Sequence, residues 1–366
     1  MKVYIQRPWK FADSPYYQYL LNYPPKEVEY IGQNQKQGTV TNKKKMFFLH
    51  QAKHYIRTFF RIFNLPIPNA HLTKTKEKYD LLHCAHCLSL NDRPWVCDTE
   101  WVGQFWISAN FDKHPNRNLV KNILENKNCK KILAWTKWSY DGIVKEFPEI
   151  KNKVEIVYPG VPSQKFKKIK SKKIRLLFVS RRFYFKGGLH ALEVIDRLTK
   201  KYKNVEGTFI SEVPKEILKK YSKNKKIKFY NMVAHEKLLK EIFPSTDILV
   251  YPSYTDTFGF TITEAMSFGI PVIAVGGHSR EEIIEQGKTG YVIEAPKRFD
   301  IKYLEELTTL KKTIDEIEQK TELLIKNKKL RERMSKEAIK EIKKGKFSIE
   351  RRNKKFVEVY KKALKT

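Results

Sequence analysis

The feature that most constrains the fold is a regular alternation of apolar runs and helical patterns between residues 174 and 293. Strands that alternate with helices of about ten residues predict βαβ units with right-handed crossovers and a parallel sheet. This stretch therefore predicts a doubly wound α/β domain of the nucleotide-binding type. The predicted strands are 174–180, 205–210, 226–230, 247–252, 271–275 and 290–293, and the predicted helices between them are 189–202, 214–221, 235–243, 261–268 and 280–286.

The length of 366 residues favours two domains over a single core. We expect an N-terminal α/β domain at 1–163, a lysine-rich linker at 164–173, and a C-terminal α/β domain at 173–345. We expect a last helix at 346–366, with an apolar stripe formed by Phe356, Tyr360 and Leu364. The N-terminal half is less regular, and its predicted strands are 1–6, 79–83, 95–98 and 131–135.

The charge balance is strongly basic, with 73 Lys and Arg residues against 40 acidic ones and a formal net charge of +33. This excess favours an anionic partner or, equally, a solvated lysine-rich surface. No uncharged apolar window is long enough to predict a membrane span, and the first residues do not form a secretory signal. We therefore expect a cytoplasmic protein.

Four cysteines raise the question of a metal site, because Cys84 and Cys87 have a spacing that suits zinc. No second pair follows at the expected distance, and the two residues continue an apolar strand pattern. We interpret them as buried structural thiols and predict no metal site.

Residues 251–274 contain the most informative chemistry. A strand ends in a turn that contains Asp256, then Gly259 allows close approach of the backbone to a ligand, and a helix begins near Phe260 and Thr261. The N–H groups at a helix start can bind phosphate. Glu264 lies inside this helix, where its carboxylate could accept hydrogen bonds from a ribose diol.

This stretch resembles the retaining glycosyltransferases of family 4, which belong to the glycosyl transferases group 1 and have the two-domain GT-B fold. Their hallmark is Glu-x7-Glu, and here Asp256 and Glu264 stand at the two acidic positions. Upstream, residues 178–187 are similar to the family's Gly-Arg-Leu-x3-Lys-Gly element, with Arg181 and Lys186 at the cationic positions and Ser180 in place of glycine.

The resemblance implies two Rossmann-like domains that face each other across a cleft, with the last helix crossing back to the N-terminal domain. It implies transfer of a hexosyl group from a UDP- or GDP-sugar to a glycan or lipid-linked acceptor, with retention of configuration and without a metal or other cofactor. Asp256 and Glu264 would be catalytic residues. The donor would be bound by Arg181, Lys186, Gly259, Phe260, Thr261 and Glu264, with His278 in a loop nearby.

The N-terminal half departs from the family in two places. Residues 7–15 lack the usual glycine-rich turn, and the region of the usual active-site histidine offers Asp98 and Glu100 instead. Either carboxylate could meet an acceptor hydroxyl, and the sequence does not choose between them.

Residues 46–63 form a basic, aromatic-rich helical pattern that follows Lys43, Lys44 and Lys45. Such a helix can lie on an anionic membrane, as in polysaccharide or glycolipid synthesis, or it can pack on its own domain. Two other functions stay open: a GT-B phosphorylase or nucleotide-sugar epimerase, and a basic nucleic-acid-binding protein. The second is disfavoured, because no helix-turn-helix, zinc-finger or RNP-type motif is visible.

Overall fold

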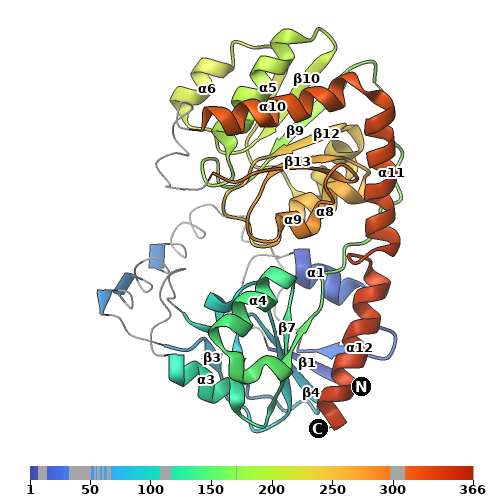
Figure 1. The fold of residues 1–366 in the computed structure, drawn as a ribbon. Helices are drawn as coiled ribbons and strands as arrows, with labels where there is room; N and C mark the ends of the chain where they lie inside the picture. The colour runs from blue at the N-terminus through green and yellow to red at the C-terminus, as the bar shows by residue number, and fades with distance from the viewer. Residues whose placement is uncertain are drawn as a thin grey trace. The chain divides into compact units, whose positions relative to one another are not determined.

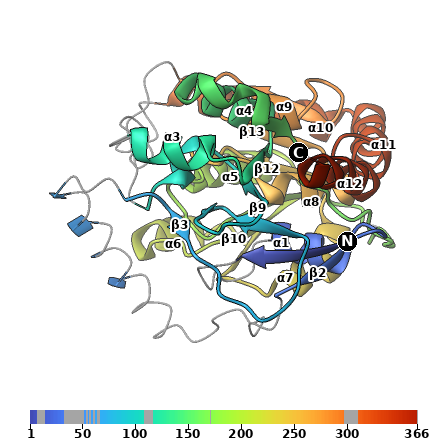
Figure 2. The ribbon, with the colours of Figure 1, turned by 90° about the horizontal axis from the view of Figure 1, so that it is seen from below.

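The computed structural model describes residues 1–6, 15–32, 51–52, 55, 58–59, 62–63, 67–107, 117–169, 171–296 and 310–365. The chain forms two compact units (Figure 1). Unit 1 comprises Met1–Gly160 and Ile349–Thr366, and unit 2 comprises Val161–Ser348. Both chain ends lie in unit 1, where the first strand and the last helix are found (Figure 1, Figure 2).

Unit 2 contains a six-stranded parallel sheet in the order β11-β10-β9-β12-β13-β14. The central strands are continuous apolar runs because helices cover both of their faces, and every residue of β12 and β13 is buried. The doubly wound sheet predicted for this stretch is confirmed. Its strands are β9 (Ile174–Val179), β10 (Val205–Ile210), β11 (Ile227–Tyr230), β12 (Ile248–Tyr251), β13 (Val272–Val275) and β14 (Gly290–Ile293).

Helices follow these strands in the doubly wound manner. The helical stretch predicted at 235–243 is a short α-turn that continues as π- and 3-10 turns, and the helix predicted at 280–286 ends at Ile283. In Figure 1, α10 runs beside α5, and it also contacts β12, β13 and β14. The helices are α5 (Gly188–Lys201), α6 (Lys215–Tyr221), α7 (His235–Lys237), η3 (Leu238–Ile242), η4 (Phe243–Ser245), α8 (Phe260–Ser267), α9 (Arg280–Ile283), α10 (Lys311–Lys326) and α11 (Lys328–Lys344).

Unit 1 contains a second six-stranded parallel sheet, in the order β2-β1-β4-β6-β7-β8. The four strands predicted in this half are confirmed with shifts of one or two residues, whereas the helices α1, α3 and α4 were not predicted. The elements are β1 (Lys2–Gln6), α1 (Pro15–Asn22), β2 (Glu29–Ile31), β3 (Ala70–His71), β4 (Leu81–Ala85), β5 (Leu88–Ser89), β6 (Trp95–Thr99), η1 (Val102–Phe105), α3 (Arg117–Glu125), β7 (Cys129–Ala134), α4 (Lys137–Glu146), η2 (Pro148–Lys153) and β8 (Val154–Ile156).

The last helix, α12 (Ile349–Lys365), belongs to unit 1 and packs against β4 and β7. Its Arg352 donates to the carbonyl oxygen of Tyr23, just after α1. Phe356 and Tyr360 of the predicted stripe are buried, whereas Leu364 is 40% exposed. The buried apolar side of the helix continues past Tyr360 to Ala363, which is 1% exposed.

The described residues of the segment predicted as a lysine-rich linker, 164–173, pack on unit 2. Phe166 contacts the ring of Phe268, and Ile169 N–H donates to the carbonyl oxygen of Pro244. Lys168 Nζ lies 3.3 Å from Asp247 Oδ1. The chain passes between the units at Gly160 and Val161, before this segment.

All four cysteines are buried thiols, as predicted for structural residues. They lie in the hydrophobic core of unit 1, and burial raises the pKa of Cys84 and Cys97 well above the usual value and that of Cys129 to about 12. Among the described residues, no group of three or more His, Cys, Asp or Glu side chains is placed to hold a metal ion. Over the same residues, no helix has the length and apolar character needed to cross a membrane.

Candidate functional site

The strand order of unit 2 marks one edge of its sheet as the place where a ligand can bind. The chain leaves β9 toward β10 and β11, and later leaves β12 toward β13 and β14, so the direction of winding reverses between β9 and β12. In open α/β sheets, ligands bind at the carboxyl ends of the strands at such a switch point. The predicted donor residues Arg181, Lys186 and Asp256 follow β9 and β12 at this edge.

Lys186 and Asp256 meet there directly. Lys186 Nζ lies 3.1 Å from Asp256 Oδ1, and each side chain is 17% exposed. Burial lowers the pKa of Lys186, and the Asp256 carboxylate offsets part of that shift. The other carboxylate oxygen, Asp256 Oδ2, accepts a hydrogen bond of 2.8 Å from the hydroxyl of Tyr251. A cation and a carboxylate are thus held together in a partly exposed position.

A glycine brings the two loops into contact. Gly187 has φ +67°, and a Cβ at this position would lie 2.2 Å from the carbonyl oxygen of Pro252. The hydroxyl of Thr255 donates to the carbonyl oxygen of Phe185, at 3.3 Å. The Lys-Gly pair is therefore explained by packing: glycine admits the neighbouring backbone, and this approach places Lys186 beside Asp256.

The start of α8 has the geometry that we predicted for an anion site. Gly259 adopts a left-handed conformation, φ +81°, immediately before Phe260 and Thr261 begin the helix. Glu264 lies in the same helix and is only 4% exposed. Its Oε1 lies 2.9 Å from His235 Nε2, an interaction that raises the pKa of His235. His235 is a residue that the sequence analysis missed, since it follows β11 far from either motif.

Arg280 is a second residue that we missed. It is 1% exposed, and its guanidinium donates to the carbonyl oxygens of Asp256, at 2.7 Å, and Gly276, at 2.8 Å. It therefore ties the loop after β13 to the loop that carries Asp256. His278 lies in the same region with φ +56°, and burial together with Arg280 lowers its pKa to about 4. Arg181, by contrast, is exposed on the loop after β9.

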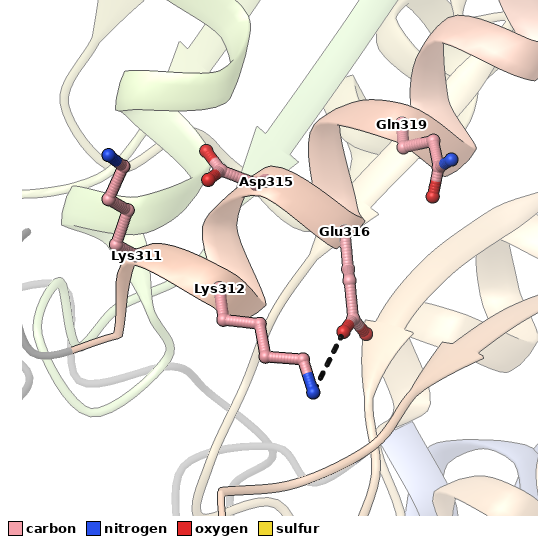
Figure 3. Close-up of a pocket in the computed structure, with 5 residues that line it drawn as sticks. All are labelled: Lys311, Lys312, Asp315, Glu316 and Gln319. Carbon is pink, nitrogen blue, oxygen red and sulfur yellow. Dashed lines mark ion pairs between the residues drawn. The ribbon is translucent and has the colours of Figure 1, made fainter.

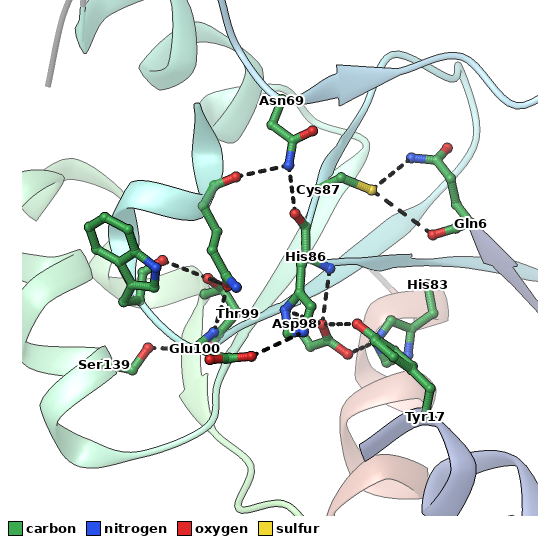
Figure 4. A network of polar contacts seen from close by, with 12 residues as sticks. Gln6, Tyr17, Asn69, His83, His86, Cys87, Asp98, Thr99, Glu100 and Ser139 are labelled. Carbon is green, nitrogen blue, oxygen red and sulfur yellow. Dashed lines mark hydrogen bonds and ion pairs between the residues drawn. The ribbon is translucent and has the colours of Figure 1, made fainter. Parts of the chain in front are cut away.

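In unit 1, Asp98 is fully buried at the end of β6 (Figure 4). Its Oδ1 accepts from the Tyr17 hydroxyl at 2.8 Å and from the backbone N–H of His86 at 3.1 Å, while Oδ2 lies 3.0 Å from His83 Nε2. Burial alone would raise the pKa of Asp98, but the two histidines and Tyr17 outweigh it and the pKa is lowered. The expectation that Asp98 meets an acceptor needs correction, because no surface of this carboxylate is open.

His86, rather than Asp98, reaches the surface of this cluster. It follows β4 at φ +52°, and its side chain is 13% exposed. Nδ1 lies 3.3 Å from Asp98 Oδ1 without hydrogen-bond geometry, and Nε2 lies 3.5 Å from Glu100 Oε1 (Figure 4). Glu100 is 26% exposed, and Gln104 accepts from its backbone N–H at 2.8 Å. The order of strands reverses between β1 and β4, so His86 also stands at a switch point.

A hollow of about 560 Å³ lies on α10 (Figure 3). Its lining side chains all come from this one helix, and Lys312 Nζ lies 3.9 Å from Glu316 Oε1 across it. A ligand site normally brings polar groups together from several elements. We assign no binding role to this hollow.

The fold of unit 2 is that of a doubly wound α/β domain with the predicted site residues at its switch point, and comparisons with known proteins bear on its family. Residues 162–309 match the family model of glycosyl transferases group 1, which supports this family for unit 2. An uncharacterized 41.2 kDa protein in the cps region of Klebsiella pneumoniae is 29% identical over 232 residues. That match covers 60% of this chain and 58% of the Klebsiella protein, so the chain spans little more than half of this relative.

Solved GT-B glycosyltransferases share the fold of nearly the whole chain. A glycosyltransferase from Rickettsia africae superposes with a TM-score of 0.62 at 15% identity, covering 100% of this chain and 98% of its own. Anabaena HepE in complex with UDP-glucose gives a TM-score of 0.61 at 14% identity, covering 98% and 99%. At this identity the likeness establishes the α/β fold with parallel sheets, as predicted, and leaves the chemistry to be argued from the site.

Proposed function

We propose that the protein transfers a sugar from a nucleotide-diphosphate donor to an acceptor hydroxyl of a glycan or lipid-linked molecule. One observation carries the proposal: Lys186, Asp256 and the start of α8 come together at the switch point of unit 2. The group 1 family match of residues 162–309 supports the same function. A UDP-sugar is the first donor to test, because Anabaena HepE has been solved with UDP-glucose.

In this proposal, Lys186 and Arg181 neutralise the negative charge that develops on the departing diphosphate. The N–H groups near Gly259, Phe260 and Thr261 add hydrogen bonds to the same phosphates. Glu264 accepts hydrogen bonds from the ribose, and Asp256 contacts the transferred sugar. Asp256 also keeps Lys186 in place before the donor arrives, since the two already lie 3.1 Å apart.

The anomeric outcome that we propose is retention, without a metal ion. Cationic side chains and helix N–H groups supply the charge stabilisation that a divalent cation would otherwise give. The acceptor attacks from the face that the diphosphate leaves, and a diphosphate oxygen takes its proton. NMR of the glycoside product tests this: the same anomeric configuration as the donor supports retention, and the opposite configuration refutes it.

Thermal shift tests the donor site directly. UDP, GDP, ADP and their sugar conjugates are added, without metal and with EDTA, to the wild type, Lys186→Ala and Glu264→Ala. A ligand at a hundred times its Kd stabilises the fold by about 2.7 kcal/mol, and this shift should be lost in both variants. Lys240→Ala is the matched control, because Lys240 pairs with its near neighbour Glu236 on an exposed surface. If no nucleotide stabilises the wild type, the proposal fails.

We further infer that the protein attaches to an anionic membrane surface at the inner face of the cell membrane. Among the described residues of the predicted helix 46–63, Tyr55, Phe59, Ile62 and Phe63 are between 54% and 70% exposed. Their spacing places them on one side of a helix. The net charge of +33 adds electrostatic attraction to anionic lipid.

Liposome sedimentation tests this attachment. The wild type should sediment with vesicles that contain phosphatidylglycerol and stay in solution with purely zwitterionic ones. Phe59→Ser combined with Phe63→Ser should weaken sedimentation, and Leu119→Ser, at a leucine 44% exposed on α3, should not. Sedimentation that does not depend on lipid charge would overturn the attachment.

A further inference from the structure

A chain of hydrogen bonds connects the C-terminal helix to the cluster around Asp98. The hydroxyls of Tyr30 and Tyr360 lie 3.1 Å apart, and the Tyr360 hydroxyl lies 2.6 Å from His83 Nδ1. His83 Nε2 lies 3.0 Å from Asp98 Oδ2. Tyr360 and His83 are 0% exposed, like Asp98, so water does not compete for these bonds. The participants come from β2, α12, β4 and β6.

The chemistry of Asp98 fixes the direction of the bond at one end of this chain. Because the pKa of Asp98 is lowered, the carboxyl is ionised at neutral pH and can only accept. His83 must therefore donate to it through Nε2–H. Nδ1 of the same ring forms the next hydrogen bond, with the Tyr360 hydroxyl, which in turn bonds to the Tyr30 hydroxyl. Burial raises the pKa of Tyr360 well above its usual value, which keeps the hydroxyl protonated as a donor.

The same carboxylate holds His86 through its other oxygen. Asp98 Oδ1 accepts the backbone N–H of His86 at 3.1 Å, which helps to keep that residue at φ +52°. This conformation is uncommon for a residue with a side chain, and the surrounding structure must maintain it. The His86 ring packs between Trp135 and Tyr17, with ring centroids 4.8 and 5.4 Å away. A carboxylate lies near each of its ring nitrogens.

We propose that Tyr360 and His83 are positioning residues that act through Asp98 on His86, so that the C-terminal helix helps to set the part of unit 1 that contacts the sugar substrate. The location supports a role beyond stability, since the chain of bonds ends at the backbone N–H of His86, whose partly exposed imidazole lies at the switch point of the sheet. An imidazole between carboxylates and aromatic faces suits a sugar, which offers hydroxyls at its edge and C–H groups on its face. Only the sugar contact rests on the proposed function.

NMR of the full-length protein with ¹⁵N-labelled histidine tests the network without any substrate. The wild type should show His83 with a proton on Nε2. In Tyr360→Phe, which removes one hydroxyl and keeps the ring, the Nδ1 resonance of His83 should move and the ring signals of His86 should shift with it. The proposal is overturned if His83 has no proton on Nε2, or if His86 is unaffected by Tyr360→Phe.

Kinetics test the link to function once thermal shift has identified a donor. Tyr360→Phe should lower kcat for sugar release from that donor by about tenfold, with a smaller change in KM. This is the low end of the loss seen when a metal-bound histidine loses the hydrogen-bond partner of its other ring nitrogen. Lys355→Ala is the control on the same helix, because Lys355 pairs with Glu155 and does not touch His83. Equal loss of kcat in both variants would mean that Tyr360 contributes only to packing and would contradict its positioning role.

A second pair of variants tests the network if Tyr360→Phe folds poorly. His83→Gln keeps a side-chain donor toward Asp98 and should retain more activity than His83→Phe at matched thermal stability. If the two are equally active, the hydrogen bond to Asp98 has no positioning role. Because the NMR readout needs no nucleotide, failure of the donor screen leaves the network result standing, and the two proposals fail separately.

Discussion

At the scale of single residues, the pair formed by His235 and Glu264 makes the stability of unit 2 depend on pH. Glu264 raises the pKa of His235 above its usual 6.5. The pair therefore stabilises the fold fully below that usual value, and the contribution is lost as pH rises through the raised pKa of the folded state. His235→Gln should cost about 1 kcal/mol or less at about pH 5.5, because the histidine side chain is 35% exposed, and nothing at about pH 8.5.

Urea unfolding of the wild type and His235→Gln at the two pH values measures this difference. Lys237→Gln is a matched control, since Lys237 Nζ lies 4.0 Å from Glu241 Oε2 on the exposed side of the same segment. A difference between wild type and His235→Gln that grows as pH rises would contradict the sign of the effect.

The two units differ in how far single residues could be predicted. Lys186 and Asp256 were predicted only as separate donor-binding residues, and they lie side by side because both follow neighbouring strands and parallel strands share one carboxyl edge. The surroundings of Asp98 could not be predicted, because they include Tyr17, 81 residues away, and His83, which is itself bonded to Tyr360, 277 residues away. Sequence spacing carries no information about such contacts, so the sequence left open whether Asp98 or Glu100 meets an acceptor.

At the scale of elements, Gly187 at the start of α5 should not tolerate a side chain. Gly187→Ala places a Cβ in the left-handed region and 2.2 Å from the carbonyl oxygen of Pro252, so the backbone must shift. We expect the free energy of unfolding to fall by about 2 kcal/mol or more.

Gly142→Ala should have the opposite effect on stability. This glycine lies inside α4, and an added Cβ would meet no atom within 4 Å. Alanine should therefore raise the free energy of unfolding by about 0.5–1 kcal/mol.

Urea unfolding midpoints of the two glycine variants, compared with the wild type at an unchanged m-value, show whether each substitution lowers or raises the free energy of unfolding. A neutral Gly187→Ala would mean that the loops after β9 and β12 are not held together as described. Donor binding should fall in the same variant, since Lys186 is the preceding residue.

Helices and strands were predicted best where residues close together in the sequence determine them. The strands β12 and β13 of unit 2 are buried on both faces and are continuous apolar runs, so their positions along the chain could be derived. Helices α1, α3 and α4 were missed because their patterns are short or weak: α1 has eight residues, buries Tyr16, Tyr17, Tyr19 and Leu20, and has no acidic residue in its first turn. The predicted aromatic helix at 46–63 and the turn at 7–15 lie largely outside the described residues.

At the scale of the whole molecule, the charge of +33 and the site of unit 2 predict different responses to salt. A basic surface binds nucleic acid by releasing counterions, so an affinity that uses six to ten phosphate contacts falls by about 10³–10⁵ between about 50 and 200 mM salt. A donor diphosphate is held by a few fixed groups and carries little charge, so its affinity should fall by about tenfold or less over the same range.

Two measurements on one preparation compare how each affinity falls with salt concentration. Fluorescence anisotropy follows binding of a labelled DNA duplex, and calorimetry follows binding of the nucleotide found by thermal shift. We expect duplex binding to vanish near 200 mM salt and to be unchanged by Lys186→Ala, because no single lysine dominates a diffuse basic surface. Nucleotide binding should survive the salt and be lost in that variant. Tight duplex binding that persists at 200 mM salt while no nucleotide binds would instead identify the basic surface as the functional one, and would make unit 2 a nucleic-acid-binding scaffold with a transferase fold.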